Sequence, residues 1–511
     1  RRHTRYWRDW SSDVCSSDLV SGAGSGTPTG SVEFFDGSTS LGTATLSGGS
    51  ASISTSALTT GSHSLTATYA GVTNFSGSTS SAYTHTVSQA SSSVSMSSSP
   101  NPSVVGGSVT LSASVTPSTA TGTVEFFEGS TSLGTGTISG GAASVSVSTL
   151  ALGSHTLHAV YSGDTDYTGS TSANHSHTVN SASTSTSLAS SQNPSVVGES
   201  VTFTATVAVS PPGSGTATGT VTFKDGSTTL GTGSLSGGVA TFSTSALALG
   251  SHSITAVYGG SSDFDGSTSS AVSQSVGQAS TSTSIASTPN PSVVGQSVAI
   301  TATVAVSSPG SGTATGDVEF FDGATSLGTV ALSGGSVTFN TSALSVGSHS
   351  LTAQYLGSSD FTGSTSSAST QTVNKASTTT SIASVPNPTL YGQSTTITAT
   401  VAAVAPGAGT ATGSVEFFDG LTSLGTATLS GGSASLSTSA LAVGNHSLTA
   451  VYAGDGSFNT STSSALSHDV NTANTTLTIV SSTNPSVKGQ SVTFTATASP
   501  SAATEIGRAH V

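Results

Sequence analysis

Residues 201–207 read Val-Thr-Phe-Thr-Ala-Thr-Val, an unbroken alternation of apolar and polar side chains. A period of two is that of a β-strand with one buried face, because successive side chains point to opposite sides of a strand. Ile254, Ala256 and Tyr258 alternate in the same way further along the chain. No helical apolar stripe competes, and the richness in Ser, Thr and Gly disfavours helix. The pattern therefore predicts an all-β fold.

A pair of adjacent phenylalanines shows which face of the next strand is buried. Phe34-Phe35 of one copy of this strand becomes Phe223-Lys224 in another copy. Lysine is almost never fully buried unless it is paired. We therefore predict that the first position of the pair faces the core and the second faces solvent.

Turn signals divide the sequence into short strands. Asp-Gly follows the aromatic pair, as at Asp36-Gly37, and suits a tight hairpin because glycine tolerates a positive φ. A Leu-Gly pair and then a Gly-Gly pair follow within about a dozen residues. Counting predicts seven or eight strands in each repeating unit. Two antiparallel sheets packed face to face bury one side of that many strands economically.

The sequence repeats itself along most of its length. Three markers recur in steps of 92, 97, 97 and 97 residues: Asn-Pro, the phenylalanine after Val-Glu or Val-Thr, and a Gly-Ser-His or Gly-Asn-His triplet with a tyrosine six residues after the histidine. A period near 97 is the size of a complete small domain and too long for one solenoid unit. The Asn-Pro positions are Asn101, Asn193, Asn290, Asn387 and Asn484.

These markers predict the domain organisation. Four complete domains are expected at residues 91–182, 183–279, 280–376 and 377–473. Residues 20–90 match a partial copy without its first two strands, and residues 474–504 match only those two strands, which we expect not to fold alone. In the 92-residue copy, Val115 to Gly122 spans eight residues where Val207 to Gly219 spans thirteen in the next. This Pro, Gly, Ser and Thr-rich stretch is interpreted as a surface loop.

The composition excludes several classes of protein. A chain of 511 residues predicts three to five domains at roughly 100–200 residues each. The net charge is −14 with 8 basic residues, so we predict no nucleic-acid partner and no anionic membrane surface. No apolar run reaches the roughly 18 residues of a transmembrane helix. The cysteine-free interior forbids disulfides and thiolate metal sites.

The two ends differ from the rest of the sequence. Both tryptophans, the single cysteine and all the arginines lie within residues 1–19 and 505–511. Residues 13–19 can be encoded by GACGTGTGCTCTTCCGATCT plus one base, and the reverse complement of that string encodes residues 506–511. This resembles a translated sequencing adapter in opposite orientations, so we predict non-native tails at 1–19 and 505–511 and leave both out of the fold argument.

The repeated motifs carry a family resemblance. The string T-G-x-V-x-F-x-D-G, then L-G, then S-T-x-x-L-x-x-G-x-H-x-L-x-A-x-Y-x-G-D resembles the bacterial Ig-like domain (group 3 type), found in tandem arrays on surface and adhesin-like proteins. The match covers essentially all of residues 20–504. The resemblance implies an all-β tandem array of Ig-like antiparallel β-sandwich domains, at the bacterial cell surface or outside the cell.

The histidine of each triplet is interpreted as a polar turn residue that opens a strand. Equivalent histidines in successive domains would lie roughly 30–40 Å apart and could not share one metal ion. For four of the five, no second histidine, cysteine or acid lies at ligand spacing in the sequence. The five are His63, His155, His252, His349 and His446.

Acids in the loop after the repeated tyrosine allow two interpretations. Asp164 and Asp166 occupy this loop in one copy, and Asp263 and Asp265 occupy it in the next. Carboxylate oxygens are ligands that Ca²⁺ prefers. The number of acids varies between copies, however, so we predict solvated loop acids and keep a calcium site at these four residues as the alternative. No other cofactor is predicted.

Two sets of aromatic residues remain. The repeated tyrosines alternate with apolar residues and are predicted to pack inward at a strand end. The outward phenylalanines are candidates for contact with a ligand, with cover for a neighbouring loop as the alternative. These candidates are Phe35, Phe127, Phe321 and Phe418.

The resulting hypothesis is a non-catalytic spacer or stalk of a secreted or cell-surface adhesin-like protein, whose partners are the other domains of its own chain. Very short linkers favour a semi-rigid rod of roughly 150–200 Å. One alternative is a glycan- or protein-binding module, with or without calcium. Another is a set of accessory repeats of an enzyme whose catalytic domain lies elsewhere.

Overall fold

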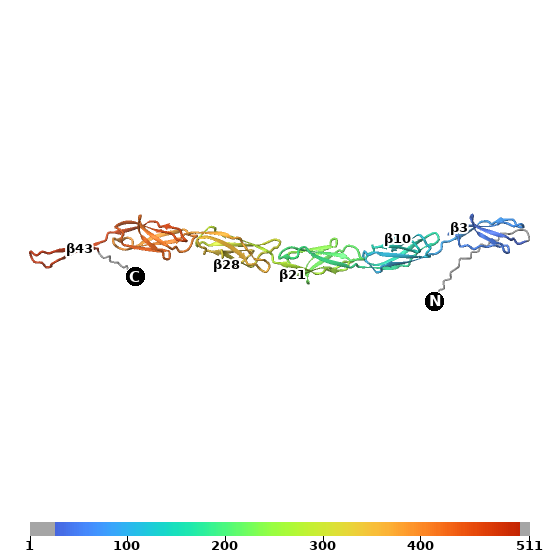
Figure 1. Cartoon of the computed structure of the whole chain (residues 1–511), viewed down its shortest axis with the longest axis horizontal. Coiled ribbons are helices and arrows are strands. Elements are labelled where there is room, and N and C mark those ends of the chain that lie inside the picture. Colours follow the sequence, from blue (N-terminus) through green and yellow to red (C-terminus); the bar gives the residue numbers. More distant parts are fainter. Residues whose placement is uncertain (1–25, 501–511) are drawn as a thin grey trace. The chain divides into compact units, whose positions relative to one another are not determined.

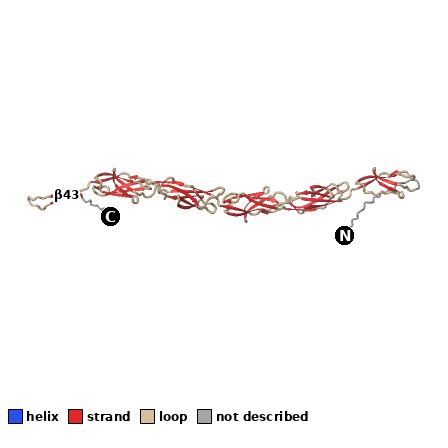
Figure 2. Cartoon of the chain, viewed as in Figure 1, coloured by secondary structure: helices blue, strands red, loops and turns tan. Residues whose placement is uncertain are grey.

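The computed structural model describes residues 26–500, and the regular structure in this range consists entirely of β-strands (Figure 2). Strands group into successive antiparallel sandwiches along the sequence (Figure 1). The predicted all-β tandem array of Ig-like sandwiches is confirmed. In the described part of the chain, no helix is long and apolar enough to span a membrane.

Domain 91–182 shows the architecture of a complete copy. One sheet has the order β10-β9-β12-β14-β7, with β13 paired to β12, and the facing sheet has the order β11-β8-β6. This makes nine strands rather than the seven or eight predicted, because β7 and β13 are too short to be seen as separate apolar runs. The strands are β6 (Ser93–Ser99), β7 (Ser103–Val104), β8 (Val109–Thr116), β9 (Thr123–Glu128), β10 (Thr131–Thr137), β11 (Ala142–Val147), β12 (Gly153–Gly163), β13 (Thr168–Thr171) and β14 (His175–Asn180).

The other complete domains repeat this topology. Domain 183–279 contains β15 (Thr184–Ser190), β16 (Ser195–Val196), β17 (Val201–Val209), β18 (Thr220–Asp225), β19 (Thr228–Ser234), β20 (Val239–Thr244), β21 (Gly250–Tyr258), β22 (Ser267–Thr268) and β23 (Val272–Gly277). Domain 280–376 contains β24 (Thr281–Thr288), β25 (Ser292–Val293), β26 (Val298–Val306), β27 (Asp317–Asp322), β28 (Thr325–Ala331), β29 (Ser336–Thr341), β30 (Gly347–Tyr355), β31 (Ser364–Thr365) and β32 (Ser369–Asn374). Domain 377–473 contains β33 (Thr378–Val385), β34 (Thr389–Leu390), β35 (Thr395–Ala403), β36 (Ser414–Asp419), β37 (Thr422–Thr428), β38 (Ser433–Thr438), β39 (Gly444–Tyr452), β40 (Ser461–Thr462) and β41 (Leu466–Asn471).

The two partial copies differ from the complete ones in what they bury. The first has β1 (Ser31–Asp36), β2 (Thr39–Thr45), β3 (Gly61–Tyr69), β4 (Ser78–Thr79) and β5 (Tyr83–Val87), all in one sheet. The last is a single hairpin of β42 (Thr475–Ser481) and β43 (Phe494–Pro500), with Leu477, Ile479 and Phe494 exposed. Within residues 26–500, no second sheet faces this hairpin to cover its apolar side chains, which is the reason for expecting it not to fold alone.

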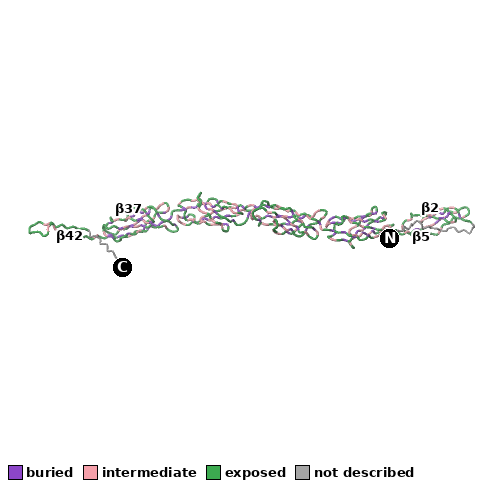
Figure 3. The backbone as a smooth tube through the Cα atoms, turned by 90° about the horizontal axis from the view of Figure 1, so that it is seen from below, coloured by how far each residue is buried: buried purple, intermediate pink, exposed green. Residues whose placement is uncertain are grey.

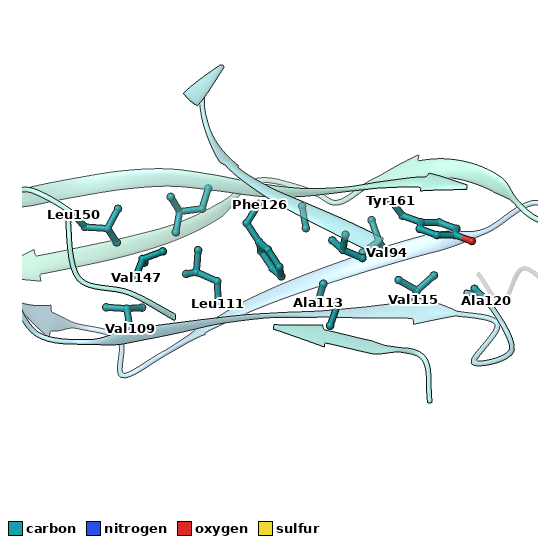
Figure 4. Close-up of a cluster of buried hydrophobic side chains, with 14 of the residues drawn as sticks. Val94, Val109, Leu111, Ala113, Val115, Ala120, Phe126, Val147, Leu150 and Tyr161 are labelled. Atoms are coloured by element: carbon teal, nitrogen blue, oxygen red, sulfur yellow. The ribbon is translucent and has the colours of Figure 1, made fainter. Parts of the chain in front are cut away.

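Alternating side chains from the two sheets form the core of each domain. Buried and exposed residues alternate along the strands (Figure 3). In domain 91–182, Phe126 and Leu111 are fully buried, and Phe126 lies between the sheets (Figure 4). The first position of the pair is a buried phenylalanine in all five copies, and the second, which is lysine in one copy, is only partly buried, which confirms the predicted orientation. Burying one such ring contributes roughly 1.5–3 kcal/mol.

The aromatic strand and its hairpin partner contain a β-bulge that explains the Leu-Gly motif. Phe34 pairs with Gly42 and Phe35 with Ser40, so Leu41 is the extra residue. Gly42 has a φ of 129°, a region that side chains rarely adopt. The Asp-Gly turn at Asp36 places Gly37 at a φ of 57°, as expected for a tight hairpin.

The chain passes through each domain from one end to the other. In domain 91–182 it enters beside Tyr167, just beyond the carboxyl end of β12, where Ala90 forms a parallel bridge. It leaves along β14, whose Val179 pairs with Gly153 at the opposite end of β12. Entry and exit are thus separated by the 11 residues of β12, or roughly 35 Å. The equivalent entry alanines, Ala182, Ala279 and Ala376, are fully buried.

The asparagine of the Asn-Pro motif ties the start of each complete domain to its last strand. Asn101 Nδ2 donates to the Ser176 carbonyl at 2.9 Å, and the Thr178 amide donates to Asn101 Oδ1 at 3.2 Å. Next to these two hydrogen bonds of Asn101, β7 runs parallel to β14 for two residue pairs only. The repeated motif is therefore explained by attachment of the chain where it crosses from one sheet to the other.

Candidate functional sites

A hollow on the outer face of domain 91–182 contains one of the predicted binding residues. Phe127 on β9 and His158 on β12 are cross-strand partners, and their rings stack with centroids 5.4 Å apart and planes inclined by 15°. The open hollow beside them has a volume of about 490 Å³ and is also lined by Glu125, Val160 and Ser162. The Glu125 carboxylate accepts a hydrogen bond from Ser132 at 2.6 Å. An aromatic platform thus lies beside an acidic acceptor.

The other predicted binding residues lack this arrangement. Phe35, Phe321 and Phe418 lie on the outer face of their sheets and are partly exposed. In each of these copies the cross-strand partner is a threonine, in the place of His158: Thr66, Thr352 and Thr449. The stacked pair in domain 91–182 therefore depends on a single histidine. The sequence analysis did not single out His158, although its departure from the threonine of the other copies was a signal, and its partner ring is evident only from the strand register.

The triplet histidine is an ion-pair partner, which the sequence interpretation missed. In domain 91–182, His155 Nδ1 lies 2.6 Å from Glu128 Oε1, and Nε2 lies 2.8 Å from the Ala151 carbonyl. Both nitrogens face acceptors, so the ring satisfies both contacts only as the doubly protonated imidazolium. Burial alone would lower the pKa of His155, but the bonds to Glu128 and Ala151 raise it above the ordinary value. The acid lies 27 residues earlier, too far for a spacing rule to detect.

The same arrangement of histidine, carboxylate and carbonyl, which we call the histidine clamp, recurs in other copies with the aspartate of the Asp-Gly turn in place of Glu128. The Nδ1 to carboxylate distances are 2.7 Å for His63 with Asp36, 2.6 Å for His349 with Asp322 and 2.6 Å for His446 with Asp419. Each Nε2 lies near the carbonyl four residues earlier. The clamp thus joins the Asp-Gly hairpin to the turn before the long strand, which gives this polar position a structural role.

Asp164, a predicted calcium ligand, forms a hydrogen-bonded cap of its own loop. Its carboxylate accepts from the Thr121 amide at 2.7 Å, the Thr121 hydroxyl at 2.9 Å, the Asp166 amide at 2.9 Å and the Tyr167 amide at 2.8 Å. These donors, the Thr121 amide first, hold the pKa of Asp164 far below its usual range. Asp455 forms the same cap with Thr412, Ser457 and Phe458. Domains 183–279 and 280–376 have Ser261 and Ser358 at this position.

The other predicted calcium ligands lie near the entry point of the chain. Asp166 Oδ1 accepts from the Thr60 hydroxyl at 3.0 Å. The Asp263 carbonyl accepts from the Ala182 amide, and the Asp265 carboxylate accepts from Ser181 at 2.5 Å and Ser183 at 3.4 Å. Among residues 26–500, no three His, Cys, Asp or Glu side chains are grouped so that they could hold a metal ion. The calcium site remains an untested alternative.

The repeated tyrosines pack inward, as predicted, at the end of the long strand. All five are at least 98% buried. Tyr69, Tyr258 and Tyr355 donate their hydroxyls to the carbonyls of Thr29, Thr218 and Thr315. Burial, and then the nearby Asp164 carboxylate, raises the pKa of Tyr161 to about 12. Their role is therefore in packing.

Comparisons with solved structures give only distant similarities. Fibronectin(III)-like modules of Clostridium thermocellum CbhA are 19% identical, with 36% of this chain and 92% of that chain covered and a TM-score of 0.16. Domains A168–A170 of titin are 10% identical, with coverage of 55% and 99% and a TM-score of 0.26. Escherichia coli alpha-2-macroglobulin activated by porcine elastase is 10% identical, with coverage of 89% and 51% and a TM-score of 0.18. No curated protein sequence matches the chain.

The family model gives a specific result. The model described as bacterial Ig-like domain (group 3) matches five segments, residues 14–88, 96–180, 188–277, 285–374 and 382–471. These segments follow the repeat seen in the sequence and cover most of the chain. Together with the repeated two-sheet topology, they show that the chain belongs to the bacterial Ig-like domain (group 3) family.

Proposed function

We propose that the chain is a non-catalytic structural spacer in a secreted or cell-surface bacterial protein. The observation that carries this proposal is the path of the chain through each domain, which enters at one end of β12 and leaves at the other. A domain connected in this way adds its own length to the chain. The family assignment supports the extracellular location, and a role as the stalk of an adhesin is the specific form that we propose.

The domain cores, which are formed mostly by the strands of one domain, support the same function. Domains 91–182 and 280–376 each have such a core, with Phe126 and Phe320 fully buried, and Val196 and Val197 of the preceding domain pack against the second core. A core formed mostly by one domain allows copies to be added or removed without loss of the others. Lys224, Lys375 and Lys488 are the only lysine or arginine residues between positions 20 and 504, which leaves few cleavage sites for trypsin-like proteases outside the cell.

The spacer function is tested by removing one domain. Deletion of residues 280–376 should shorten the maximum dimension of the chain in small-angle X-ray scattering by roughly 30–40 Å, the length of one domain. The remaining domains should keep their thermal unfolding midpoints, because each has its own core. An unchanged maximum dimension, or unfolding of the neighbouring domains, would contradict the proposal.

A second function, glycan binding, is supported by the hollow of domain 91–182. The stacked rings of Phe127 and His158 offer an aromatic platform, and Glu125 and Ser162 offer polar groups for sugar hydroxyls. Ligand sites commonly combine such an apolar surface with a few polar groups that fix orientation. We propose that a neutral sugar ring stacks here, with an adhesive role for this domain.

A glycan array probed with the full chain tests this second function. Binding should be lost in Phe127→Ala and weakened in His158→Thr, which restores the residue of the other copies. Phe321→Ala provides the matched control, because Phe321 has the same outward position beside a threonine. The array is repeated with Ca²⁺ and with a chelator, so that a calcium requirement is detected. Binding that survives Phe127→Ala, or no binding to any glycan, would contradict the proposal.

A further inference from the structure

A buried histidine links both sheets of domain 91–182 to its last strand. His177 on β14 is 0% exposed. Its Nδ1 lies 2.9 Å from the Ser98 hydroxyl on β6, and its Nε2 lies 2.9 Å from the Ser103 hydroxyl on β7. Residues 98–104, which we call the crossing segment, connect the two sheets. His177 thus contacts both ends of the crossing segment.

The attachment of the crossing segment is otherwise limited. Strand β7 forms two residue pairs with β14, and the side-chain amide of Asn101 adds two hydrogen bonds to β14. Two-residue strands contribute little hydrogen bonding of their own, so the contacts of His177 are a large share of the attachment. Opening of this segment would expose the edge of β14 and the core beneath it.

The same position is glutamine in two other complete domains. Gln371 is 0% exposed, and its Nε2 donates to the Pro289 carbonyl, the Ser292 hydroxyl and the Thr372 carbonyl, each at 3.1 Å. The hydroxyl oxygen of Ser287, the counterpart of Ser98, is buried without a hydrogen-bond partner. Gln274 occupies the position in domain 183–279. Glutamine does not titrate, so these two attachments carry no ionisable group.

Domain 377–473 returns to histidine. His468 is 0% exposed, with Nδ1 2.9 Å from the Ser384 hydroxyl and Nε2 3.2 Å from the Thr389 hydroxyl. His446 on β39 lies on one side, and Asp469 follows directly on β41, where it accepts a hydrogen bond from Asn445. The Asp469 charge favours protonation of His468, whereas burial and His446 oppose it.

The surroundings of His177 are unfavourable to positive charge. Its ring centroid is 6.5 Å from that of His155 on β12, which the Glu128 clamp holds in the cationic form. His175 on β14 shares the Ser98 hydroxyl at 2.8 Å. Among residues 26–500, no carboxylate lies within ion-pair distance of His177 itself. Burial, followed by His155 and His175, lowers the pKa of His177 below its ordinary value.

We propose that His177 and His468 make domains 91–182 and 377–473 sensitive to mild acid. Protonation places a second, unpaired cation in a buried site beside the clamp histidine and favours release of the crossing segment. Domains 183–279 and 280–376, with glutamine at this position, keep the segment attached under the same conditions. Acid therefore loosens the crossing segment in two of the four complete domains, although all four have the same fold.

The pH window follows from proton linkage. When the crossing segment is open, His177 is exposed to solvent, has an ordinary pKa of about 6.5 and binds a proton below that pH, whereas the buried ring of the closed state resists protonation. The closed state is therefore fully favoured above pH 6.5 and loses stability as the pH falls below it. Each pH unit within this window changes the opening equilibrium by up to about tenfold. The clamp histidines have raised pKa values, so their contribution to domain stability is lost only above pH 6.5. The effect of His177 below pH 6.5 can therefore be measured apart from the effect of the clamp.

Hydrogen exchange of the full chain tests the proposal. Exchange is followed by mass spectrometry at pH 7 and pH 5, with rates corrected for the intrinsic dependence on pH. Peptides covering residues 93–104 report on domain 91–182, and those covering 282–293 report on domain 280–376. The corrected exchange in the first set should rise about tenfold more than in the second. Equal changes in the two sets would overturn the proposal.

Reciprocal variants identify the residue responsible. His177→Gln should remove the excess exchange of residues 93–104, because it installs the residue of the neighbouring domains. Gln371→His should create the excess in residues 282–293, and it is expected to fold because Ser287 and Ser292 offer the hydroxyls that His177 uses. Excess exchange that survives His177→Gln, or does not appear in Gln371→His, would count against the proposal.

A direct titration covers the case in which His177→Gln alters the domain. The imidazole carbon-bound proton signal of His177 in NMR spectra of the full chain is assigned by its absence in His177→Gln. Its titration midpoint should lie below that of an ordinary histidine. A signal that titrates with an ordinary midpoint would overturn the proposal whatever the exchange data show.

Discussion

Domains 91–182 and 377–473 differ from domains 183–279 and 280–376 at a loop position and at a buried polar position on the last strand, whereas the cores of all four domains are built alike. The first pair has Asp164 or Asp455 as a loop cap, and the second has serine there. The first pair has a buried histidine on the last strand, and the second has glutamine. Phe126, Phe320 and Phe417 are fully buried in both kinds of domain. Copies with one fold thus differ in which ionisable groups they bury or cap.

The comparison implies a division of roles within the domain. The apolar positions that alternate along the strands determine the sandwich and supply most of its stability. The polar positions at the loop cap and the last strand determine how that stability responds to pH. Substitutions at these two positions can therefore change how the stability of one domain depends on pH without altering its core packing.

The largest expected effect is a test of the shared core. Phe126→Ala and Phe320→Ala should each destabilise their own domain by about 3–5 kcal/mol, because each leaves a cavity between the sheets. The two losses should agree within about 1 kcal/mol, as measured by denaturant-dependent hydrogen exchange of each domain. Phe321→Ala, on the outer face of the same strand, is the control and should cost far less. A large difference between Phe126→Ala and Phe320→Ala would break the comparison, since it would mean that the cores are not equivalent.

A smaller effect is expected at the loop cap. Asp455→Ser converts domain 377–473 to the serine type and should cost about 1–2 kcal/mol, allowing for solvent that screens this half-exposed carboxylate. The pKa of Asp455 is lowered by the hydrogen bonds of Thr412 and the loop amides, against the effect of burial. Its contribution is therefore complete above the ordinary carboxyl pKa and is lost as the pH falls below about 4.

Thermal unfolding at pH 7 and pH 3 checks the cap prediction. The difference between the Asp455→Ser chain and the unmodified chain should be large at pH 7 and should shrink at pH 3, where the Asp455 carboxyl is mostly protonated in the unfolded chain while the folded cap resists protonation. Asp317→Asn, which removes an exposed carboxylate from another domain, should leave the midpoint nearly unchanged at both values. An equal loss at both pH values would show that the charge of the cap is irrelevant.

The smallest effect is expected at the histidine clamp, which both kinds of domain share. The pKa of His349 is raised, because its bonds to the Ser345 carbonyl and Asp322 outweigh burial. The clamp therefore stabilises domain 280–376 below pH 6.5 and loses this contribution as the pH rises through the raised pKa. His349→Gln should cost about 0.5 kcal/mol at pH 6 and less at pH 9.

Chemical denaturation across this pH range sharpens the clamp prediction. Asp322→Asn should reproduce the loss at pH 6, because it removes the charged acceptor and leaves the histidine in place. His158→Thr, which removes a histidine without a carboxylate partner at 2.6–2.7 Å, is the control. A clamp effect that grows toward pH 9 would reverse the expected sign and refute the imidazolium assignment.

The alternation of side chains allowed the fold to be predicted from local sequence. Residues 201–207 form the beginning of β17 (Val201–Val209) with the expected inward face, and Phe223-Lys224 showed correctly which member of the aromatic pair is buried. Differences between copies, such as Lys224 in place of a phenylalanine, were as informative about side-chain orientation as the repeated residues. The short strands β7 and β13 were missed because two to four residues carry no periodic signal.

The candidate site could be predicted only in part. The outward position of Phe127 followed from the alternation, but its stacking on His158 depends on strands that are 31 residues apart in sequence at that point. The cap of Asp164 joins residues 43 apart, and the contacts of His177 span more than 70. One signal for His177 was available, because it shares the inward face of its strand with Val179. A polar residue on an apolar face indicates a buried hydrogen-bonding role.

Backbone geometry makes the alternation of side chains a local property, so strand identity, inward faces and the repeat of domains could be read from neighbouring residues alone. The ionisation of His155, Asp164 and His177 depends instead on donors, acceptors and charges contributed by other strands. Those neighbours are brought together by sheet register and by packing between sheets, which no short window of sequence contains. Folding of the whole domain therefore determines which of its polar residues are charged.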